Sequence, residues 1–383
     1  MKKTLKNLRP VYVVGIGWHR YQDPSDTSYV TLGLAAARQA LANAGVPFAG
    51  VDTAYVARAL LGMACGRPIL RHLGATGLPI THVENASASG STAFRNACIE
   101  VGSGLADTAL VLGVDKRPPA PVVRGEAQAG IEQLASEYIA PFTHFALLAD
   151  KYVHRSGAGM RDIARVAVKN HRNGALNPNA QRQKERTLDE VLAGRRVSGE
   201  LTVLQCTPLG EGAAAVVLMS EEAIKAHGIN SGRAVRVLSS AAQSQAVYED
   251  ATAFDELLTQ ATCLQALREA GVAPAALDVV ELHDAFSIEE VLYVEAMGLC
   301  KPGEAIAALK AGEFDIGGRV AVSPSGGLIA MGHPIGPTGV GQIAEIALQL
   351  RGEAGARQQP GARTGLAHMV GVGAVCYAHV LSI

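Results

Sequence analysis

The serine at position 87 is the first residue whose position suggests chemistry. It lies in the segment VENASASGSTAF at 83–94, where an apolar approach leads into small residues and then a helical pattern. This order predicts a strand-to-helix turn, at which a nucleophile would be exposed and helix amides would face developing negative charge. A serine in such a run is also typical of a helix cap. Ser87 is therefore a candidate nucleophile, with capping as the alternative.

Two histidines occupy comparable positions later in the chain. His283, in ELHDAFSIEE, follows an apolar strand and precedes the acidic start of a helix, where an imidazole could donate a hydrogen bond or shuttle protons. His333 lies in SPSGGLIAMGHPIGPTGVGQ, whose glycines indicate close backbone approach to a ligand and whose Pro334 fixes the chain direction. The alternatives are a structural histidine for His283 and an ordinary turn for the segment around His333.

An internal repeat indicates how these segments are positioned. QALANAGVPFAGVD at 39–52 returns as QALREAGVAPAALD at 265–278, with eight of fourteen positions identical. In each copy a helix ends at glycine and a loop leads to an apolar strand, TAYVA or VVELH. The repeat predicts two α/β halves related by pseudo-symmetry, with a cleft between them.

The remaining strand candidates are short and rich in Val, Ile and Leu, at 11–16, 108–114, 213–219, 234–238 and 374–381. We expect largely parallel sheets alternating with helices, in an N-terminal half at 1–232 and a C-terminal half at 233–383. Between about 117 and 210 clustered Pro, Asn, Arg and Lys indicate an inserted loop domain. It is either a solvated excursion or one whose basic residues meet ligand phosphates.

Composition limits the classes of function. The 34 Lys and Arg balance 35 Asp and Glu, which gives no global field for nucleic acid or an anionic membrane. We expect no transmembrane span, because no segment approaches 18 uninterrupted apolar residues, and we interpret the opening segment as a first strand rather than a signal peptide. The six scattered cysteines show no metal-type pairing, so we expect no metal site and a cytoplasmic protein.

Taken together, the motifs resemble the thiolase superfamily, particularly the branch of the sterol-carrier-protein thiolases, over nearly the whole chain. The resemblance is carried by Ser87-Ala88-Ser89 at a CxS-like position, HDAF at 283–286 with EAMGLCKPGEA after it, SGGL with GHP at 325–334, and HMVGVGA at 368–374. KNHRNGALNPNAQ and LTVLQCTPLGEGAAAVVL are also similar to that branch. It implies a thiolase fold, layered α-β-α-β-α.

The resemblance also implies roles. Ser87 stands at the nucleophile position, His333 is its base, and His283 lines an oxyanion hole for a thioester enolate. The backbone amides of Ser87 and Gly371 form a second hole for the tetrahedral oxyanion. Both intermediates place negative charge on a thioester oxygen, so preorganised donors would lower the barrier.

The chain departs from the family pattern at the nucleophile and at the second acid/base. Family members running the full reaction carry Cys where this chain has Ser87, and a hydroxyl must lose its proton during attack, so acyl transfer would be slower. Ala285 and Met369 occupy the places of a second cysteine, and His144 is a candidate replacement, with a structural histidine as the alternative. Ser87 is either an introduced substitution that keeps substrate intact or a natural variant without covalent acyl transfer.

Three functions follow as expectations. The first is an acyl-CoA acyltransferase that cleaves a 3-oxoacyl-CoA or runs the reverse Claisen condensation, with coenzyme A as cosubstrate and no covalently bound cofactor. Aromatic-compound degradation is one setting that the resemblance suggests for it. The second is a carbon-carbon lyase acting by retro-aldol cleavage of a 3-hydroxyacyl-CoA. The third is a non-catalytic subunit. A homodimer and a small zinc-ribbon/OB-fold partner are the expected associations.

Overall fold

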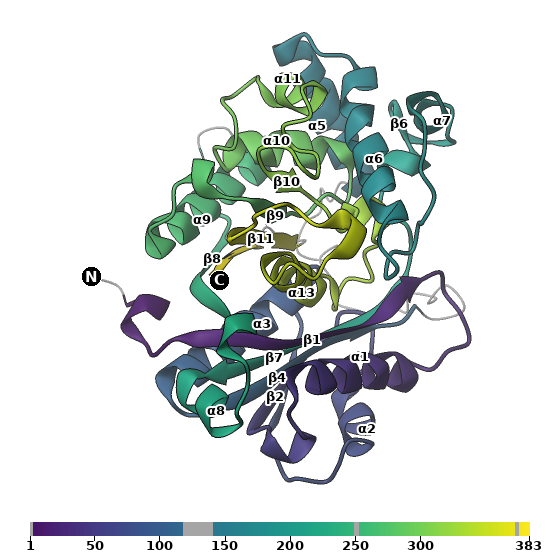
Figure 1. The fold of residues 1–383 in the computed structure, drawn as a ribbon. Coiled ribbons are helices and arrows are strands. Elements are labelled where there is room, and N and C mark those ends of the chain that lie inside the picture. Colours follow the sequence, from purple (N-terminus) through teal and green to yellow (C-terminus); the bar gives the residue numbers. More distant parts are fainter. Residues whose placement is uncertain (1–2, 118–140, 249–252, 372–374) are drawn as a thin grey trace.

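The computed structural model describes residues 3–117, 141–248, 253–371 and 375–383. Two halves of similar build lie one above the other, and the N-terminal half is the lower one in Figure 1. Its elements precede and follow an insertion. They are β1 (Val11–Gln22), α1 (Tyr29–Ala44), β2 (Thr53–Ala57), α2 (Gly66–Arg71), β3 (Ile80–Val83), α3 (Ser89–Ser103), β4 (Thr108–Asp115) and β7 (Glu211–Ser220).

The C-terminal half follows a short helix, α8 (Glu221–Ala226), and repeats this order of strands. Additional helices lie between its strands. Its elements are β8 (Val235–Ser244), α9 (Phe254–Ala270), β9 (Val279–Glu281), α10 (Ser287–Ala296), α11 (Ala305–Lys310), β10 (Ala321–Val322), α12 (Gly327–Ala330), α13 (Thr338–Leu350), β11 (Thr364–Gly371) and β12 (Val375–Ser382).

The strand order shows the duplication directly. Among the described residues the main sheet runs β10-β9-β11-β12-β8-β1-β7-β4-β2-β3, so β3-β2-β4-β7-β1 in one half corresponds to β10-β9-β11-β12-β8 in the other. Only two residue pairs, Tyr12 with Arg236 and Val13 with Val235, join the halves across β1 and β8. The duplicated α/β architecture expected from the repeat is thereby confirmed.

The repeated sequence segments adopt matching local structure. α1 ends at Gly45 with φ 72° and α9 ends at Gly271 with φ 72°, the left-handed conformation that glycine adopts most easily. A single 3-10 turn then leads into β2 in one half and β9 in the other. The two copies therefore enter equivalent strands in the same direction.

The sheets are mixed rather than largely parallel, which corrects the sequence-based expectation. β2 pairs in parallel with β3 and β4, and β9 pairs in parallel with β10 and β11. The remaining pairs, β4 with β7, β7 with β1, β11 with β12 and β12 with β8, are antiparallel. Most of these strands, namely β4, β7, β9, β11 and β12, are buried on both faces, so their apolar runs do not reveal direction.

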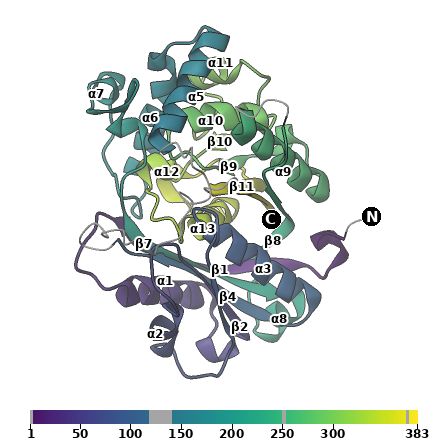
Figure 2. The same cartoon turned by 180° about the vertical axis from the view of Figure 1, so that it is seen from behind.

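Helices separate and cover the two half-sheets. α1 packs on β1 and β7 from below, α3 and α13 lie between the half-sheets, and α9 covers β8 and β12 from above, which gives the α-β-α-β-α layering (Figures 1 and 2). α13 is buried along nearly its whole length because it contacts β7 on one side and β11 on the other. The site described below lies at the amino ends of the two central helices, α3 and α13.

The insertion between β4 and β7 packs on the C-terminal half. Within its described part α6 contacts α10 and α12. Its elements are α5 (Pro141–Ser156), α6 (Met160–Ala175), α7 (Leu188–Leu192), β5 (Arg196–Ser198) and β6 (Leu201–Thr202).

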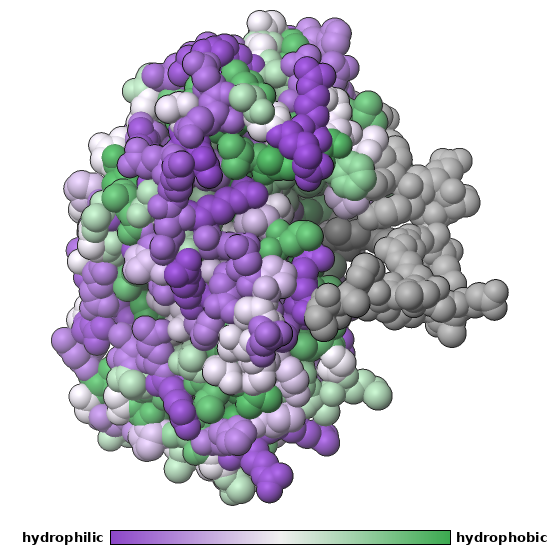
Figure 3. Space-filling view, turned by 90° about the vertical axis from the view of Figure 1, so that its right-hand side faces the viewer, coloured by the Kyte–Doolittle hydropathy of each residue, from purple (hydrophilic) through white to green (hydrophobic). Residues whose placement is uncertain are grey.

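The surface carries no extended apolar face in the view of Figure 3, where hydrophilic and apolar residues are interspersed. None of the helices in the described part of the chain has the length and hydropathy needed to cross a bilayer.

Candidate active site

Ser87 lies at the turn between β3 and α3, as the sequence predicted. The turn is strained, because Ala86 has φ 47°, a conformation that costs a non-glycine residue free energy and recurs at functional sites. Ser89 stabilises the turn by donating its hydroxyl to the Ala86 carbonyl at 2.6 Å and accepting from the Asn85 amide at 2.8 Å. Ser89 thus caps the turn, which leaves the Ser87 hydroxyl available.

His333 contacts Ser87 directly. Its Nε2 lies 3.0 Å from the Ser87 Oγ, and its Nδ1 lies 2.8 Å from the Thr338 Oγ1 in the first turn of α13. When Nδ1–H donates to Thr338, Nε2 is free to accept the serine proton. Burial lowers the pKa of His333 well below its ordinary value, and the charges of His283 and Arg117 lower it further. A neutral imidazole of this kind is the form that accepts a proton.

His283 packs against His333. The two ring centroids are 5.4 Å apart and the planes are perpendicular. The Nδ1 of His283 lies 2.7 Å from the Glu289 Oε1, and both side chains are buried. Its backbone amide points to the Nδ1 of His368 at 3.4 Å. With Nδ1 engaged by a carboxylate, Nε2 is the nitrogen left to meet a ligand.

Glu289 is held on two further sides. Its Oε2 accepts from the Phe286 amide at 2.9 Å, and its Oε1 accepts from the Tyr293 hydroxyl at 3.2 Å. The sequence indicated only that the helix after His283 has an acidic start. Glu289 lies in the first turn of α10, shortly after His283, and this position could have identified it as the residue that orients the imidazole.

Gly371 lies at the end of β11, against the Ser87 turn. A Cβ added there would come within 2.9 Å of the Asn85 carbonyl oxygen and 3.2 Å of the Ala88 Cβ. Only glycine therefore lets β11 approach this turn so closely. The next residues of HMVGVGA, 372–374, lie outside the described part of the chain.

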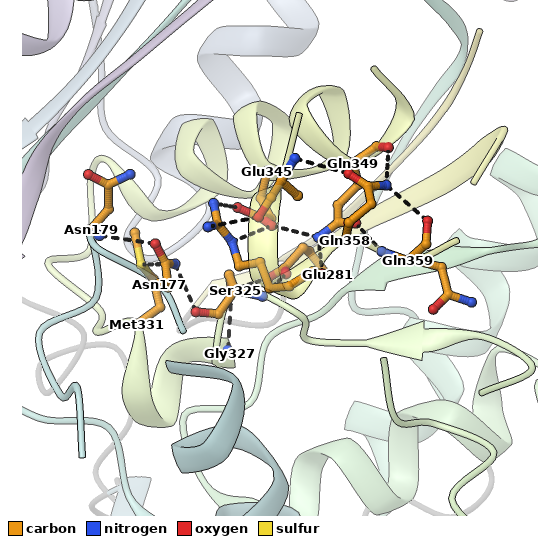
Figure 4. A network of polar contacts seen from close by, with 12 residues as sticks. Asn177, Asn179, Glu281, Ser325, Gly327, Met331, Glu345, Gln349, Gln358 and Gln359 are labelled. Carbon is orange, nitrogen blue, oxygen red and sulfur yellow. Dashed lines mark hydrogen bonds and ion pairs between the residues drawn. The ribbon is translucent and has the colours of Figure 1, made fainter. Parts of the chain in front are cut away.

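A buried polar network supports the loop that carries His333 (Figure 4). Glu281, at the end of β9, accepts from the Ser325 amide at 2.9 Å and hydroxyl at 2.8 Å, and Asn177 donates to the Ser325 carbonyl at 2.9 Å. Burial and the nearby Glu345 raise the pKa of Glu281 to about 8. The same loop contains positive φ angles at Ser323 (54°) and Ile335 (68°), so these bonds hold a strained backbone in place.

His144 does not contact this group of residues in the described structure. Its Nε2 lies 2.7 Å from the Asp255 Oδ2, and its ring stacks on Phe254. The hydrogen bond to Asp255 raises the pKa of His144, while burial opposes the rise. The geometry favours the structural alternative stated for this histidine.

Several basic residues of the insertion are engaged internally. Lys169 is buried with Glu290, Arg172 pairs with Asp315, and Arg182 donates to the backbone carbonyls of Cys206 and Ile329. Arg186 contacts Glu190. These contacts hold the insertion on the C-terminal half and argue against phosphate recognition by these four side chains.

The chain matches the model of the thiolase N-terminal domain over residues 20–188 and that of the thiolase C-terminal domain-like family over residues 239–383. It is 38% identical over 384 residues to "Sterol carrier protein 2" of Gallus gallus, covering 95% of this chain and 70% of the relative. The chain belongs to the thiolase family. This membership makes it an acyltransferase of the thiolase type, as the motifs predicted.

Two further comparisons bear on assembly and chemistry. The "Benzoylsuccinyl-CoA thiolase subunit BbsB" of Thauera aromatica is 36% identical over 377 residues, covering 96% of both chains. The structure titled "Ltp2-ChsH2(DUF35) aldolase" superimposes with a TM-score of 0.82, at 22% identity, covering 97% of both chains. At 22% identity, the similarity to the aldolase structure establishes only that the two proteins share a fold.

Proposed function

We propose that this thiolase-family chain cleaves a 3-oxoacyl-CoA with coenzyme A, or runs the reverse Claisen condensation, with the acyl group carried on residue 87. The observation that carries the proposal is the 3.0 Å contact between the Ser87 Oγ and the His333 Nε2, beside the ring of His283. A nucleophile and its base then face the 3-oxo carbonyl, and a hydrogen-bond donor faces the thioester carbonyl of the same substrate.

The steps follow from these positions. The Ser87 Oγ attacks the 3-oxo carbon while its proton passes to the His333 Nε2. The carbon-carbon bond then breaks, its electron pair forms the enolate of the departing thioester, and the enolate carbon takes the proton that His333 accepted. The thiol of coenzyme A next attacks the acyl group on residue 87, which releases the shortened acyl-CoA, and the thiol proton passes to the oxygen of residue 87 and restores the hydroxyl.

Two sets of donors stabilise the charges that develop. The His283 Nε2–H donates to the enolate oxygen, and Glu289 holds the ring in place through its contact with the Nδ1. The backbone amides of Ser87 and Gly371 donate to the tetrahedral oxyanion. A missing donor in such a hole typically costs a factor of about 10²–10³ in kcat.

A serine at position 87 lowers the rate of this reaction. A thiolate forms readily next to an imidazole and exchanges with thioesters, whereas the hydroxyl must be deprotonated in the transition state. We therefore test the proposal by thiolysis of a panel of 3-oxoacyl-CoAs with the chain as it stands and with Ser87→Cys and Ser87→Ala. The proposal expects Ser87→Cys to be the fastest and Ser87→Ala to be inactive. A Ser87→Cys protein that binds coenzyme A yet leaves every 3-oxoacyl-CoA intact would contradict it.

A second candidate reaction is retro-aldol cleavage of a 3-hydroxyacyl-CoA. It needs an enolate hole but no acyl-enzyme, so a hydroxyl at position 87 would suffice. The aldolase named in the comparison shares the fold of this chain. Against this reaction stands the contact of His333 with Ser87, which would have no task. Release of an aldehyde from a 3-hydroxyacyl-CoA, unchanged in Ser87→Ala, would favour the lyase.

The proposed setting is a cytoplasmic homodimer that binds acyl-CoA and coenzyme A and associates with a small zinc-ribbon/OB-fold protein. The name of the Thauera relative refers to a subunit, and the aldolase title names two components, which supports a partner. A role in aromatic-compound degradation also rests on that relative's name. Co-purification of such a protein would support the association, and full activity of the isolated chain would exclude an obligatory partner and a purely non-catalytic role.

A further inference from the structure

Three parallel strands of the N-terminal half end at the edge that carries Ser87. Because β2, β3 and β4 run in the same direction, their carboxyl ends lie side by side. Arg58 directly follows β2, the Ser87 turn follows β3, and Arg117 lies two residues beyond β4. The Arg58 amide donates to the Val83 carbonyl at 3.1 Å, which fixes it beside the end of β3. Two guanidinium groups therefore start from the same edge as the nucleophile.

The loop of His333 packs on this edge. The Gly336 amide donates to the Asp115 Oδ2 at 2.8 Å, and a Cβ added to Gly336 would lie 2.7 Å from the Arg58 Cα. Arg117 is close enough for its charge to lower the pKa of His333. The Arg58 backbone thus lies beside the loop of His333, and the Arg117 charge lies near the imidazole of His333.

Neither guanidinium has a partner among the residues that the structure describes. The Arg58 Nε is buried and makes no hydrogen bond. Arg117 is partly buried, and burial lowers its pKa from the ordinary value although Asp115 opposes this effect. Lys116, between Asp115 and Arg117, differs: its Nζ lies 2.9 Å from the Glu211 Oε2.

Asp115, the buried carboxylate at this edge, is already occupied by backbone amides. Its two oxygens accept from Ala59 and Gly336 at 2.8 Å and from Leu60 and Leu61 at 2.8 and 3.2 Å. Four donors satisfy the four lone-pair positions of a carboxylate, so Asp115 has none left for a guanidinium. A partly desolvated charge that has no partner in the described part of the chain is costly, which favours an anionic ligand at this place.

We propose that Arg58 and Arg117, the arginine pair, bind a carboxylate on the acyl group, so that the chain selects 3-oxoacyl-CoAs with a second acidic group. The planar guanidinium matches a carboxylate with two parallel hydrogen bonds. The phosphates of coenzyme A are the other source of negative charge. They are separated from the thioester by the whole pantetheine arm, whereas the arginine pair starts from the strand edge that carries Ser87, and Arg117 lies near the base that meets the reacting carbonyl. The inference rests on the proposed function.

The test compares two substrates of equal chain length, 3-oxoadipyl-CoA and 3-oxohexanoyl-CoA, which differ in a terminal carboxylate or methyl group. Thiolysis is measured in the Ser87→Cys background with Arg58→Gln, Arg117→Gln and the double variant. Each substitution should lower kcat/KM for the carboxylate substrate about 10-fold or more, since a charged hydrogen bond is lost, and change it about twofold or less for the neutral substrate. Arg71→Gln, on the exposed end of α2, is the matched control.

Each other outcome overturns the inference. An equal loss for both substrates, together with weaker binding of free coenzyme A, assigns the arginine pair to the phosphates. Unchanged rates for both substrates assign the arginine pair a structural role. Urea unfolding of the same variants shows whether misfolding causes any loss of kcat/KM. Calorimetry with both substrates and the unsubstituted chain tests the inference separately from the proposed function. If the chain binds 3-oxoadipyl-CoA more tightly and this preference depends on the arginine pair, the inference is supported even if no thiolysis occurs. If thiolysis occurs without the preference, the inference is refuted and the proposed function is not.

Discussion

The corresponding edges of the two halves differ in how their charges are used. Where β2, β3 and β4 end, Arg58 and Arg117 have no described partner and Ser87 faces His333. Where β9 ends, the charged side chains are paired and buried. They are Glu281, Asp284, Glu289 and Glu290, held by Ser325, Asn170, His283 and Lys169. In the proposed mechanism one half of the duplicated fold provides the edge that meets the ligand, and the other provides the scaffold of buried charges that holds the imidazoles.

The largest effect is expected from breaking the scaffold. Lys169 lies 3.1 Å from the Glu290 Oε1, and both side chains are almost fully buried. Burial and the nearby Glu290 raise the pKa of Asp284 well above its ordinary value, and the charge of Lys169 opposes this rise. Lys169→Met leaves buried carboxylates uncompensated and should lower the free energy of unfolding by about 3–5 kcal/mol, measured in urea. The control is Lys225→Met, which removes an exposed pair with Glu221 and should leave the free energy of unfolding little changed. Equal losses would mean that this region is no more tightly held than the surface.

The next effect concerns how the scaffold orients His283. Glu289→Gln removes the carboxylate 2.7 Å from the Nδ1, so the imidazole loses the charged partner that fixes its orientation. In the Ser87→Cys background we expect kcat to fall about 10²-fold, or about 2.7 kcal/mol in barrier, with KM little changed. Glu256→Gln, which removes a partly buried pair with Arg155 on α9, serves as control. An unchanged midpoint of urea unfolding would distinguish this role from a purely structural defect; an unaltered rate would remove Glu289 from the account.

The smallest effect concerns the insertion that packs on the scaffold. Burial, followed by the charge of Arg182, lowers the pKa of His171 to about 4. Above pH 6.5 this histidine is neutral in both states; as the pH falls further, the unfolded chain binds a proton that the folded chain does not, and stability is lost until about pH 4. Between pH 6.5 and 5 the loss is about 2 kcal/mol.

His171→Gln should flatten this part of the stability curve, whereas substitution of the exposed His154 by Gln should leave its slope as it was. Urea unfolding at several pH values measures both slopes. If the His171 variant retains the full slope, the proton is bound elsewhere.

Much of this comparison could be predicted from the sequence. The repeat at 39–52 and 265–278 predicted the duplication, and the turns around Ser87, His283 and His333 followed from strand and helix signals in their segments. Strand direction could not be predicted, because buried strands carry the same apolar run in either direction. The antiparallel strands β7 and β12 were therefore placed in sheets expected to be parallel.

The partners of the charged residues were the other part that the sequence did not predict. Lys169 and Arg182 belong to the insertion whose basic residues were possible phosphate ligands. The sequence did not show that Lys169 is paired inside the protein, because its partner Glu290 is more than one hundred residues away along the chain. Arg58 and Arg117 are single charges after separate strands, and only the parallel pairing of β2 and β4 brings them to one edge. Local sequence patterns predict turns and the buried faces of helices and strands, whereas the pairing of buried charges depends on the tertiary fold.

The most direct test of the central claim is to locate an acyl group on the protein. Ser87→Cys is incubated with acetyl-CoA, quenched in acid and examined by intact-mass and peptide mass spectrometry, alongside Ser87→Cys with His333→Ala. The account predicts an acetyl group on residue 87 that forms rapidly only when His333 is present, because the imidazole next to residue 87 takes its proton. An acetyl group on another residue, or none on a folded protein that binds coenzyme A, would contradict it.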